Sequence, residues 1–498
     1  MSLFLLVLVL TLICIFVKKN LSYWVERGVP GPQPLPIVGN IGRNILGKVS
    51  QGQIFTDIYR TYQEYSFVGI FRGTVPYLLV RDPDFIRNII VKDFKHFQEN
   101  NVAVNEDVDP IFARNPFVIK DIAVWKLKRA QLISCFSSGK MKRYYPLLEE
   151  SAMKMIKYIE NQLRTSAPLE CRELSVRFSL ESVASCVFGI DGKCFEEDYP
   201  KFREMADEVL SPRGLLRGLK LTLILSWPSL AKPLKMKFVS KEVEDKLFGT
   251  VRMSLKLRKE NNVVRNDFLD YLSQLSSNTE SFSEMDLIGH AASFFSGGYE
   301  TTSRAMGFFI FELAMNPECQ DKLRQEIIHS YEENGNKFSY ESINEMRYLD
   351  ACFNENMRKN AISHYMTKVC TERYTFTPTN PEYKKMSVTL EPGTPIIIPL
   401  RGLLSDPKYW NSPEKFVPER FLDRDSVHKF TYLPFGEGPR ICIGQRFGTT
   451  QLKVVIAHLL KNFVLEVNSK TQFPVKYNPF HILLTPVEGL WINLRRLK

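Results

Sequence analysis

One stretch decides how this chain is interpreted: Phe435-Gly436-Glu437-Gly438-Pro439-Arg440-Ile441-Cys442-Ile443-Gly444. It places a cysteine in a glycine-rich turn, beside an arginine and directly before an apolar helical pattern over 447–460. A thiolate needs positive potential and nearby donors, and a helix N-terminus supplies both. The glycines let the backbone approach something flat and bulky, and the phenylalanine could shield the sulfur from water. Such surroundings suit a cysteine bound to haem iron, although a structural role in a loop is the usual one for a lone cysteine.

A second stretch, Phe295 to Thr302, contains two consecutive glycines inside a helical pattern. Each glycine costs about 1 kcal/mol relative to alanine in a helix, so something must require the missing side chains. Close packing of two helices is one explanation, and room for oxygen between a helix and a haem face is the other. Glu300 and Thr301 would then provide an acid and a hydroxyl for a proton relay at that gap.

Two further patterns place charged groups on single helical faces. Glu355 and Arg358 are three residues apart, a spacing equally common in surface ion pairs, and Arg420 follows in a later turn. Trp125 and Arg129 are one turn apart, so an indole N–H and a guanidinium lie on one face and suit a carboxylate.

These stretches resemble motifs of the cytochrome P450 superfamily: the F-x-x-G-x-R-x-C-x-G haem loop, the [A/G]-G-x-[D/E]-T-[T/S] distal helix, the E-x-x-R helix with its P-E-R-F partner, and W-x-x-x-R. With 137–142 and 406–410, the chain resembles insect microsomal members of the detoxification type, in the clan that also holds vertebrate hepatic drug oxidases. The resemblance runs from about Val29 to the C-terminus.

The resemblance implies haem b (iron protoporphyrin IX), with Cys442 as the axial ligand of the iron and Glu300 and Thr301 as the catalytic residues. Glu355, Arg358 and Arg420 would form a buried charged network that supports the haem loop. The remaining cofactor-binding residues that it implies are Trp125, Arg129, Gly297, Gly298, Lys368, Phe435, Arg440 and Gly444. Lys368 stands where many relatives carry an arginine, which keeps the charge but loses the fork.

Several positions depart from the family's pattern. Ala361 replaces a proline, Ile122 replaces a frequent glycine, and the polar run 363–365 replaces a mostly apolar stretch that would face substrate. His364 could be a hydrogen-bonding group at the haem edge or a distal ligand that inhibits. The residues expected to line the substrate pocket are Phe117, Phe294, Ser363, His364, Tyr365 and Val487.

Composition limits the compartment and the partners. The nine cysteines are odd in number and form no C-x-x-C pair, which argues for a reducing compartment. The net charge of +11 suggests an acidic partner or an anionic membrane, and no nucleic-acid-binding signature accompanies it. A basic surface, expected either to be merely solvated or to dock an acidic electron donor, would comprise Lys126, Lys128, Lys140, Lys142 and Arg143.

The N-terminus is expected to be a membrane anchor. Leu3–Val17 is almost wholly apolar and is followed by Lys18 and Lys19, which favours an uncleaved anchor with a cytosolic body over a secretory signal. We expect an anchor at 1–20, a linker with a proline-rich hinge at 21–38 and a haem-thiolate domain at 39–498. The basic, apolar segment 211–238 is interpreted either as a core helix pair or as a surface that dips into anionic lipid.

The expected fold is mainly α with small β-sheets (α+β), a cytochrome P450 fold with a single large helical body and an N-terminal anchor helix. Helical spacing dominates, for example at Leu148, Ala152, Met155, Ile156 and Ile159. Short β-rich runs lie far apart in the chain, which indicates one intertwined domain. They are 67–71, 77–80, 395–399, 481–484 and 490–492, with a strand expected within 364–370.

These expectations define an NADPH- and O2-dependent monooxygenase of the endoplasmic reticulum membrane. Its partners would be an NADPH–cytochrome reductase, a cytochrome b-type donor, membrane lipid, O2 and an apolar substrate, with no nucleic acid. It would hydroxylate or epoxidise insecticides, plant toxins, or endogenous lipids and hormones. The alternatives are an O2-independent haem isomerase or dehydratase, a silent haem-binding or ligand-sequestering protein, and an anchored protein without haem.

Overall fold

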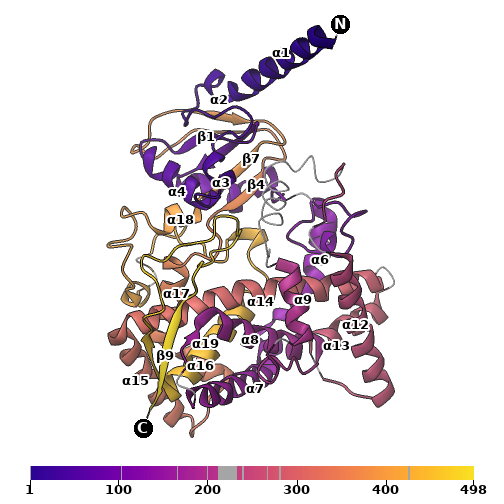
Figure 1. Cartoon of the computed structure of the whole chain (residues 1–498), viewed down its shortest axis with the longest axis vertical. Coiled ribbons are helices and arrows are strands. Elements are labelled where there is room, and N and C mark those ends of the chain that lie inside the picture. The colour runs from indigo at the N-terminus through magenta and orange to yellow at the C-terminus, as the bar shows by residue number, and fades with distance from the viewer. Residues whose placement is uncertain are drawn as a thin grey trace.

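The computed structural model describes residues 2–102, 104–164, 167–198, 200–210, 233–237, 240–265, 267–279, 282–423, 425 and 427–497. It is a largely helical body with small sheets, so the expected α+β class is confirmed (Figure 1). The helices are α1 Ser2–Leu21, α2 Tyr23–Glu26, α3 Gly42–Ile45, α4 Gln51–Thr61, α5 Pro83–Arg87, α6 Ile122–Ile133, α7 Ser138–Leu163, α8 Cys171–Val183, α9 Lys201–Leu210, α12 Lys241–Asn261, α13 Phe268–Asn278, α14 Glu284–Met315, α15 Pro317–Glu333, α16 Tyr340–Glu345, α17 Arg347–Lys359, α18 Leu400–Leu404 and α19 Gln445–Asn462.

The strands pair segments that are distant in the sequence. One sheet has the order β1-β2-β7-β4, a second β3-β9-β8 and a third β5-β6. In the first sheet, β2 runs parallel to β7 with Leu78 opposite Ile396, and β4 runs antiparallel to β7 with Lys368 opposite Ile396. The strands are β1 Phe67–Arg72, β2 Val75–Val80, β3 Leu169–Glu170, β4 Met366–Val369, β5 Tyr374–Phe376, β6 Val388–Leu390, β7 Pro395–Ile398, β8 Phe463–Val467 and β9 Trp491–Arg496.

One predicted strand is wrong. The segment 481–484 forms no strand and makes a single bridge, between Ser363 and Leu483. It belongs instead to a hairpin-like loop, which we call the C-terminal hairpin (residues 476–487). Main-chain bonds close this loop, from Asn478 N–H to the Thr485 carbonyl and from Val487 N–H to the Lys476 carbonyl.

The long helix α14 crosses the middle of the body (Figure 1). It starts in a capping box, because the Ser283 hydroxyl accepts from Asp286 N–H and the Asp286 carboxylate accepts from Ser283 N–H. Helix α8 approaches it closely, since a Cβ on Gly307 would lie 3.3 Å from the main chain of Arg172. The predicted apolar face of α7 is buried against the same core.

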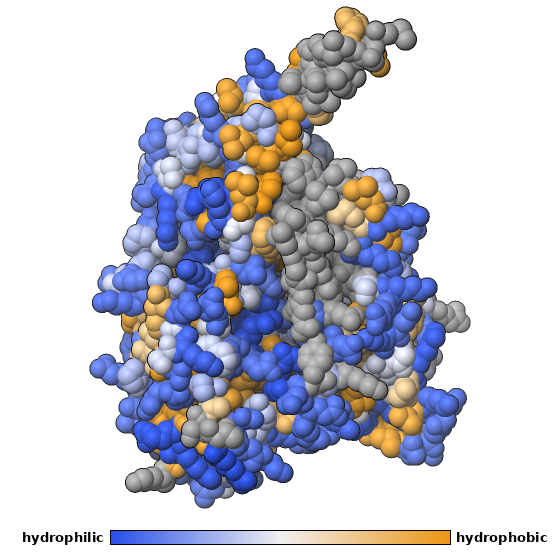
Figure 2. Space-filling model, viewed as in Figure 1, coloured by the Kyte–Doolittle hydropathy of each residue, from blue (hydrophilic) through white to orange (hydrophobic). Residues whose placement is uncertain are grey.

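Helix α1 projects beyond the body at the end of the molecule that carries the first sheet (Figure 1). Of the helices that the structure describes, none has the length and apolarity needed to cross a membrane. Figure 2 shows hydrophobic surface gathered at the base of α1. The exposed apolar side chains of this part of the chain include Val25 at 77%, Leu35 at 60% and Ile37 at 64%.

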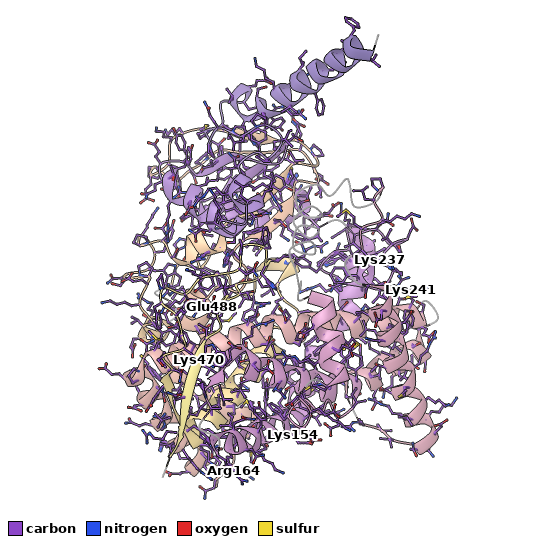
Figure 3. The ribbon with its side chains drawn as sticks, in the orientation of Figure 1. Lys154, Arg164, Lys237, Lys241, Lys470 and Glu488 are labelled. Carbon is purple, nitrogen blue, oxygen red and sulfur yellow. The ribbon has the colours of Figure 1, made fainter. Side chains whose placement is uncertain are left out.

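Most of the segment 211–238 lies outside the described residues, so the structure tests neither interpretation made for it. The described chain resumes at 233, and Lys237 lies shortly before α12 (Figure 3). Its ammonium lies 3.2 Å from the carboxylate of Glu244, one turn into that helix.

Candidate active site

The cysteine loop (residues 435–444) folds into two tight turns ahead of α19. Gly436 and Gly438 have φ values of 72° and 74°, a region that favours glycine. A Cβ on Gly438 would lie only 2.0 Å from the carbonyl oxygen of Ile90, so no other residue fits there without displacing main chain. The N–H of Cys442 donates to the Phe435 carbonyl at 2.9 Å. This bond ties the main chain of Cys442 to the start of the loop.

Cys442 differs from the other cysteines whose burial the structure describes, because it is exposed whereas they are buried or partly buried. Although part of its surface is accessible, the surrounding protein desolvates the thiol and raises its pKa, and the Gly444 N–H and the Arg129 guanidinium oppose that rise. The Arg129 guanidinium donates to the Ile441 carbonyl at 2.7 Å, next to the cysteine. Burial outweighs both, so the free thiol stays protonated, and the positive charge and the N–H offset part of the cost of a thiolate at this position.

Three cations gather beside the loop. Arg440 stacks on Trp125, 4.5 Å from the ring centroid, and the Arg129 guanidinium lies 5.8 Å from the same ring. Lys368 is buried and donates to the neutral amide of Asn100 at 2.8 Å. Burial and the charge of Arg440 lower the pKa of Lys368 to about 7.

The same crowding acts on Arg440, whose pKa falls to about 10 through burial, with Arg129 adding to the fall and Glu99 opposing it. Its guanidinium donates to the carbonyls of Gln98, Pro116 and Ile119, all neutral acceptors. Crowded, partly desolvated cations of this kind favour an anionic group. The cluster therefore fits the two carboxylates of a haem.

Behind the loop, Glu355, Arg358 and Arg420 come together. Glu355 and Arg358 are both fully buried, with the carboxylate 2.7 Å from the guanidinium, and Arg420 Nε lies 3.4 Å from the same carboxylate. Glu355 also accepts from Val417 N–H at 2.9 Å. This network ties α17 to the turn around Pro418–Phe421. Phe435 stacks on Phe353 of α17, with ring centroids 6.3 Å apart.

The middle of α14 carries a narrow accessible strip. Gly297 and Thr301 are exposed, although their neighbours 299, 300 and 302 are buried. A Cβ on Gly297 would meet nothing within 4 Å. The Thr301 hydroxyl donates to the Gly297 carbonyl at 2.7 Å, so both residues lie on one open face. Gly448 of α19, which follows the cysteine loop, faces the adjacent Thr302, since its Cβ would lie 3.6 Å from that hydroxyl.

Gly298 lies on a different face of α14 from Gly297. A Cβ there would lie 3.2 Å from Phe294 and 3.4 Å from Val183 of α8. Consecutive helical residues are about 100° apart, so only one of the two glycines can face the open strip. Gly297 lines the strip and Gly298 serves helix packing.

Glu300 is also turned away from Thr301. It is 1% exposed, and one of its oxygens accepts from Arg304 Nε at 2.9 Å and lies 3.5 Å from Arg172 of α8. Burial alone would raise the pKa of Glu300, but the two guanidinium groups outweigh it and lower the pKa below its usual value. The carboxylate is therefore held ionised, in a buried ion pair.

The residues predicted to line the substrate pocket do not form one group. Phe294 is buried among Phe136, Phe268 and Phe447, where it is part of the core. Phe117 and Val487 are 57% and 55% exposed. The carbonyl of Phe117 accepts from Asn100, the residue that holds Lys368, so this segment borders the cationic cluster.

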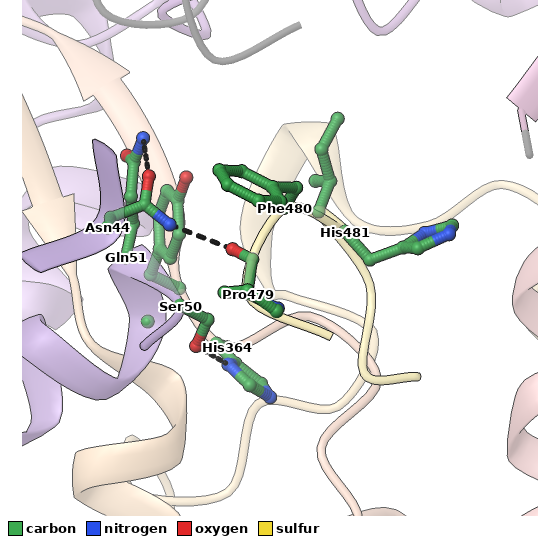
Figure 4. Close-up of a pocket in the computed structure, with 10 residues that line it drawn as sticks. Asn44, Ser50, Gln51, His364, Pro479, Phe480 and His481 are labelled. Carbon is green, nitrogen blue, oxygen red and sulfur yellow. Dashed lines mark hydrogen bonds between the residues drawn. The ribbon is translucent and has the colours of Figure 1, made fainter. Parts of the chain in front are cut away.

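The polar run 363–365 instead faces the first sheet and α4. His364 lies directly on Gly52, where any Cβ would come within 2.2 Å of it, and its Nδ1 lies 3.4 Å from the Ser50 hydroxyl (Figure 4). Tyr365 packs edge-on against Phe55, with ring centroids 4.9 Å apart. Ser363 is exposed and donates to the Tyr365 carbonyl. His364 thus packs against α4, and its roles at the haem stay predictions.

The expected basic surface loses one member. Lys128 is buried, and its ammonium lies 2.8 Å from Asp286, at the start of α14. Lys126 is exposed, while Lys142 pairs with Glu341. One face of α6 is therefore a structural contact with α14 and the other remains available to a partner.

Sequence reasoning missed two residues that shape this site. Arg304 carries the counter-charge of Glu300, and Asn100 holds Lys368 beneath Arg440. The first had a signal, because an acid and a base four residues apart in an otherwise apolar helix indicate a pair. The second had none, since a contact between residues 100 and 368 depends on the tertiary fold.

The accessible cysteine, the cationic cluster and the open strip on a long central helix are the features expected of a haem-thiolate oxygenase. A profile of the Cytochrome P450 family matches residues 29–493. The chain therefore belongs to the cytochrome P450 family and is a P450 monooxygenase, a family that implies a haem cofactor, reductase-supplied electrons, O2 and a small-molecule substrate.

Curated relatives match nearly the whole chain. It is 32% identical to cytochrome P450 6j1 of Blattella germanica, over 97% of this chain and 95% of that protein. It is 32% identical to cytochrome P450 6A1 of Musca domestica, with the same coverage. Probable cytochrome P450 6a20 of Drosophila melanogaster is 34% identical, over 99% of both chains.

Proposed function

We propose that this protein hydroxylates or epoxidises apolar small molecules, using O2 and electrons that a reductase passes on from NADPH. Xenobiotics such as insecticides or plant toxins, and endogenous lipids or hormones, are the substrate classes. The observation that carries the proposal is the exposed Cys442 thiol, in a loop beside three cations and leading into the helix that packs next to Thr302. An accessible thiol in such surroundings suits a metal-bound thiolate.

Cys442 would bind the iron of haem b through its sulfur, and Arg129, Arg440 and Lys368 would neutralise the two propionates of the haem. When bound, the haem supplies the activation of oxygen, so that one oxygen atom enters the substrate and the other leaves as water. Trp125 and the main chain around Gly436, Gly438 and Gly444 would border the flat group. Glu355, Arg358 and Arg420 support the loop from behind.

Protons for this chemistry would pass through the hydroxyl of Thr301. It lies on the open strip of α14, and its bond to the Gly297 carbonyl fixes its position. Gly297 keeps the space beside it free of side chains. Glu300 would act on this relay as a fixed negative charge on the buried side of the helix, because Arg304 and Arg172 hold it ionised.

The setting would be the endoplasmic reticulum membrane, with the body facing the cytosol and α1 as the attachment. Phe4 at 74%, Leu5 at 61% and Phe16 at 61% exposed leave apolar surface on α1, and Lys18 and Lys19 lie in its last turn. Apolar surface at the base of α1 would extend this contact (Figure 2). Apolar substrates concentrate in such a membrane.

The test is a ferrous–CO spectrum of the purified full-length protein. Wild type should show the red-shifted band of a thiolate-ligated haem, and Cys442→Ala should abolish it. Cys319→Ala, which removes a half-buried thiol elsewhere, is the matched control and should keep the band. A normal band in Cys442→Ala refutes the assignment. Product formation with a reductase, which should cease without NADPH or O2, then tests the reaction itself.

A further inference from the structure

The C-terminal hairpin is held by residues that lie far from it in the sequence. At one side, the Asn44 amide of α3 donates to the Pro479 carbonyl at 2.8 Å (Figure 4). Nearby, Leu484 N–H donates to the Ile362 carbonyl at 3.0 Å. Between these contacts, Ile482 is 40% exposed. The hairpin therefore presents an apolar side chain while its main chain is fastened to the first-sheet side of the molecule.

Arg304 fastens the same hairpin to α14. Its guanidinium donates to the Leu484 carbonyl at 3.2 Å and to the Thr485 hydroxyl, and it lies 3.4 Å from Nδ1 of His481. Arg304 is 2% exposed, so these bonds replace its hydration. It lies one helical turn beyond Thr301. The hairpin is thus joined to α14 within a turn of the open strip.

The charge of Arg304 is balanced by Glu300. A buried guanidinium without a counter-charge would be costly, and Glu300 supplies that charge from the preceding turn. One carboxylate oxygen of Glu300, Oε2, is buried with no hydrogen-bond partner among the described residues. The other oxygen, Oε1, accepts from Arg304 and lies close to the guanidinium of Arg172. Glu300 therefore serves as a counter-ion to Arg304.

We propose that Arg304 is a positioning residue that sets substrate specificity by holding the C-terminal hairpin against the strip of α14, with Glu300 as its counter-ion. The inference rests on the proposed function, because it assumes that substrate lies at the strip. Apolar side chains of the hairpin, Ile482 and Val487, would then border large ligands and leave small ones unaffected. Glu300 contributes to this positioning through Arg304.

The first experiment measures the hairpin directly, by hydrogen exchange of the full-length protein. Arg304→Gln removes the charged donors to the hairpin, so exchange of amides in 476–487 should rise about tenfold, the size expected for losing bonds to a charged group. Arg304→Lys keeps the charge but loses the branched donors of the guanidinium, so its exchange rate should lie between those of wild type and Arg304→Gln. Glu312→Gln removes another buried carboxylate from α14, one paired with Lys359, and should leave the hairpin unchanged.

The double variant Glu300→Gln/Arg304→Gln separates positioning from charge burial. It removes both charges, so the thermal midpoint should return toward wild type. Exchange of the hairpin should stay high, because the bonds to Leu484 and Thr485 are still missing. If the ion pair only balances buried charge, the thermal midpoint and the exchange of the hairpin should both return to wild-type values. If Arg304→Gln alone fails to fold, this variant decides the question.

The second experiment titrates the haem-loaded proteins with imidazole and with N-benzylimidazole, followed by the Soret shift. In Arg304→Gln and in the double variant, the Kd of the bulky ligand should change at least about fivefold, and that of imidazole less than about twofold. Wild-type values for both ligands together with unchanged exchange would overturn the proposal. If wild type lacks the thiolate-type CO band, the proposed function fails, whereas the exchange result still judges Arg304.

Discussion

The cysteine loop and the middle of α14 both belong to the proposed haem site, but different interactions hold them. The loop is held by its main-chain conformation and by bonds to main-chain carbonyls. Gly436 and Gly438 adopt positive φ, and the Arg440 guanidinium donates to three carbonyls. The middle of α14 depends on side-chain charge, with Glu300 and Arg304 balancing each other in the core. The loop is therefore sensitive to added atoms, and the helix to altered charge.

The largest effect should come from Gly438→Ala. Its Cβ would collide with the Ile90 carbonyl, so we expect the CO band to be lost and the free energy of unfolding in urea to fall by at least about 3 kcal/mol. Gly436→Ala is the matched control, because its Cβ would lie 3.4 Å from the flexible end of Met366. It should cost about 1 kcal/mol. Equal effects would show that positive φ alone matters.

Glu355→Gln tests whether charge also supports the loop. Removing this carboxylate leaves Arg358 buried without its partner, which should cost about 3–5 kcal/mol in urea unfolding. Glu419→Gln, at an exposed carboxylate paired with Lys322, should cost less than about 1 kcal/mol. A cost for Glu355→Gln as small as that of the control would show that buried charge stabilises the middle of α14 but not the loop.

Lys368 should make the stability of the haem-free chain depend on pH. Its pKa falls from 10.5 to about 7 on folding, so between these values the unfolded chain binds more protons and stability rises with pH. The difference in unfolding free energy between wild type and Lys368→Met should shift by up to about 2 kcal/mol from pH 7 to pH 9, in favour of wild type. A shift in the opposite direction would contradict this account of the cationic cluster.

Thr301→Ala tests the open strip without disturbing the buried pair. We expect product formed per O2 consumed to fall roughly tenfold, because a proton donor is lost. Stability should change by less than about 0.5 kcal/mol, since the side chain is exposed. Thr302→Ala removes a buried hydroxyl that faces α19 and should leave the yield of product per O2 unchanged. A fall of this yield in Thr302→Ala alone would place the proton relay on the α19 side of α14.

The smallest effect should come from Lys126→Ala on the exposed face of α6. The KM for reductase should rise about two- to threefold at low salt, and the difference should disappear at high salt. Lys128→Ala should lower stability instead, because Lys128 is buried against Asp286. An equal rise in KM for both variants, with stability unchanged, would contradict the division of α6 into two faces.

Much of the helical body and the cysteine loop could be predicted from the sequence, because glycine turns and helical periodicity are local properties. The direction of individual side chains could not. Gly298 faces Val183 because α8 packs there, and His364 faces Gly52 because β4 pairs with β7 next to α4. Lys128 likewise has a partner 158 positions later in the chain, Asp286, that no local pattern connects to it. Each of these side-chain directions depends on a contact that only the tertiary fold makes.

The exposure of one sulfur makes this protein a chemical reporter of its own state. Cys135, Cys186 and Cys352 are buried, so they are shielded from alkylating reagents. A mild maleimide pulse would therefore label Cys442 in preference to them whenever its sulfur is free. The labelled fraction, read by peptide mass, would count the molecules in a preparation that lack a bound metal.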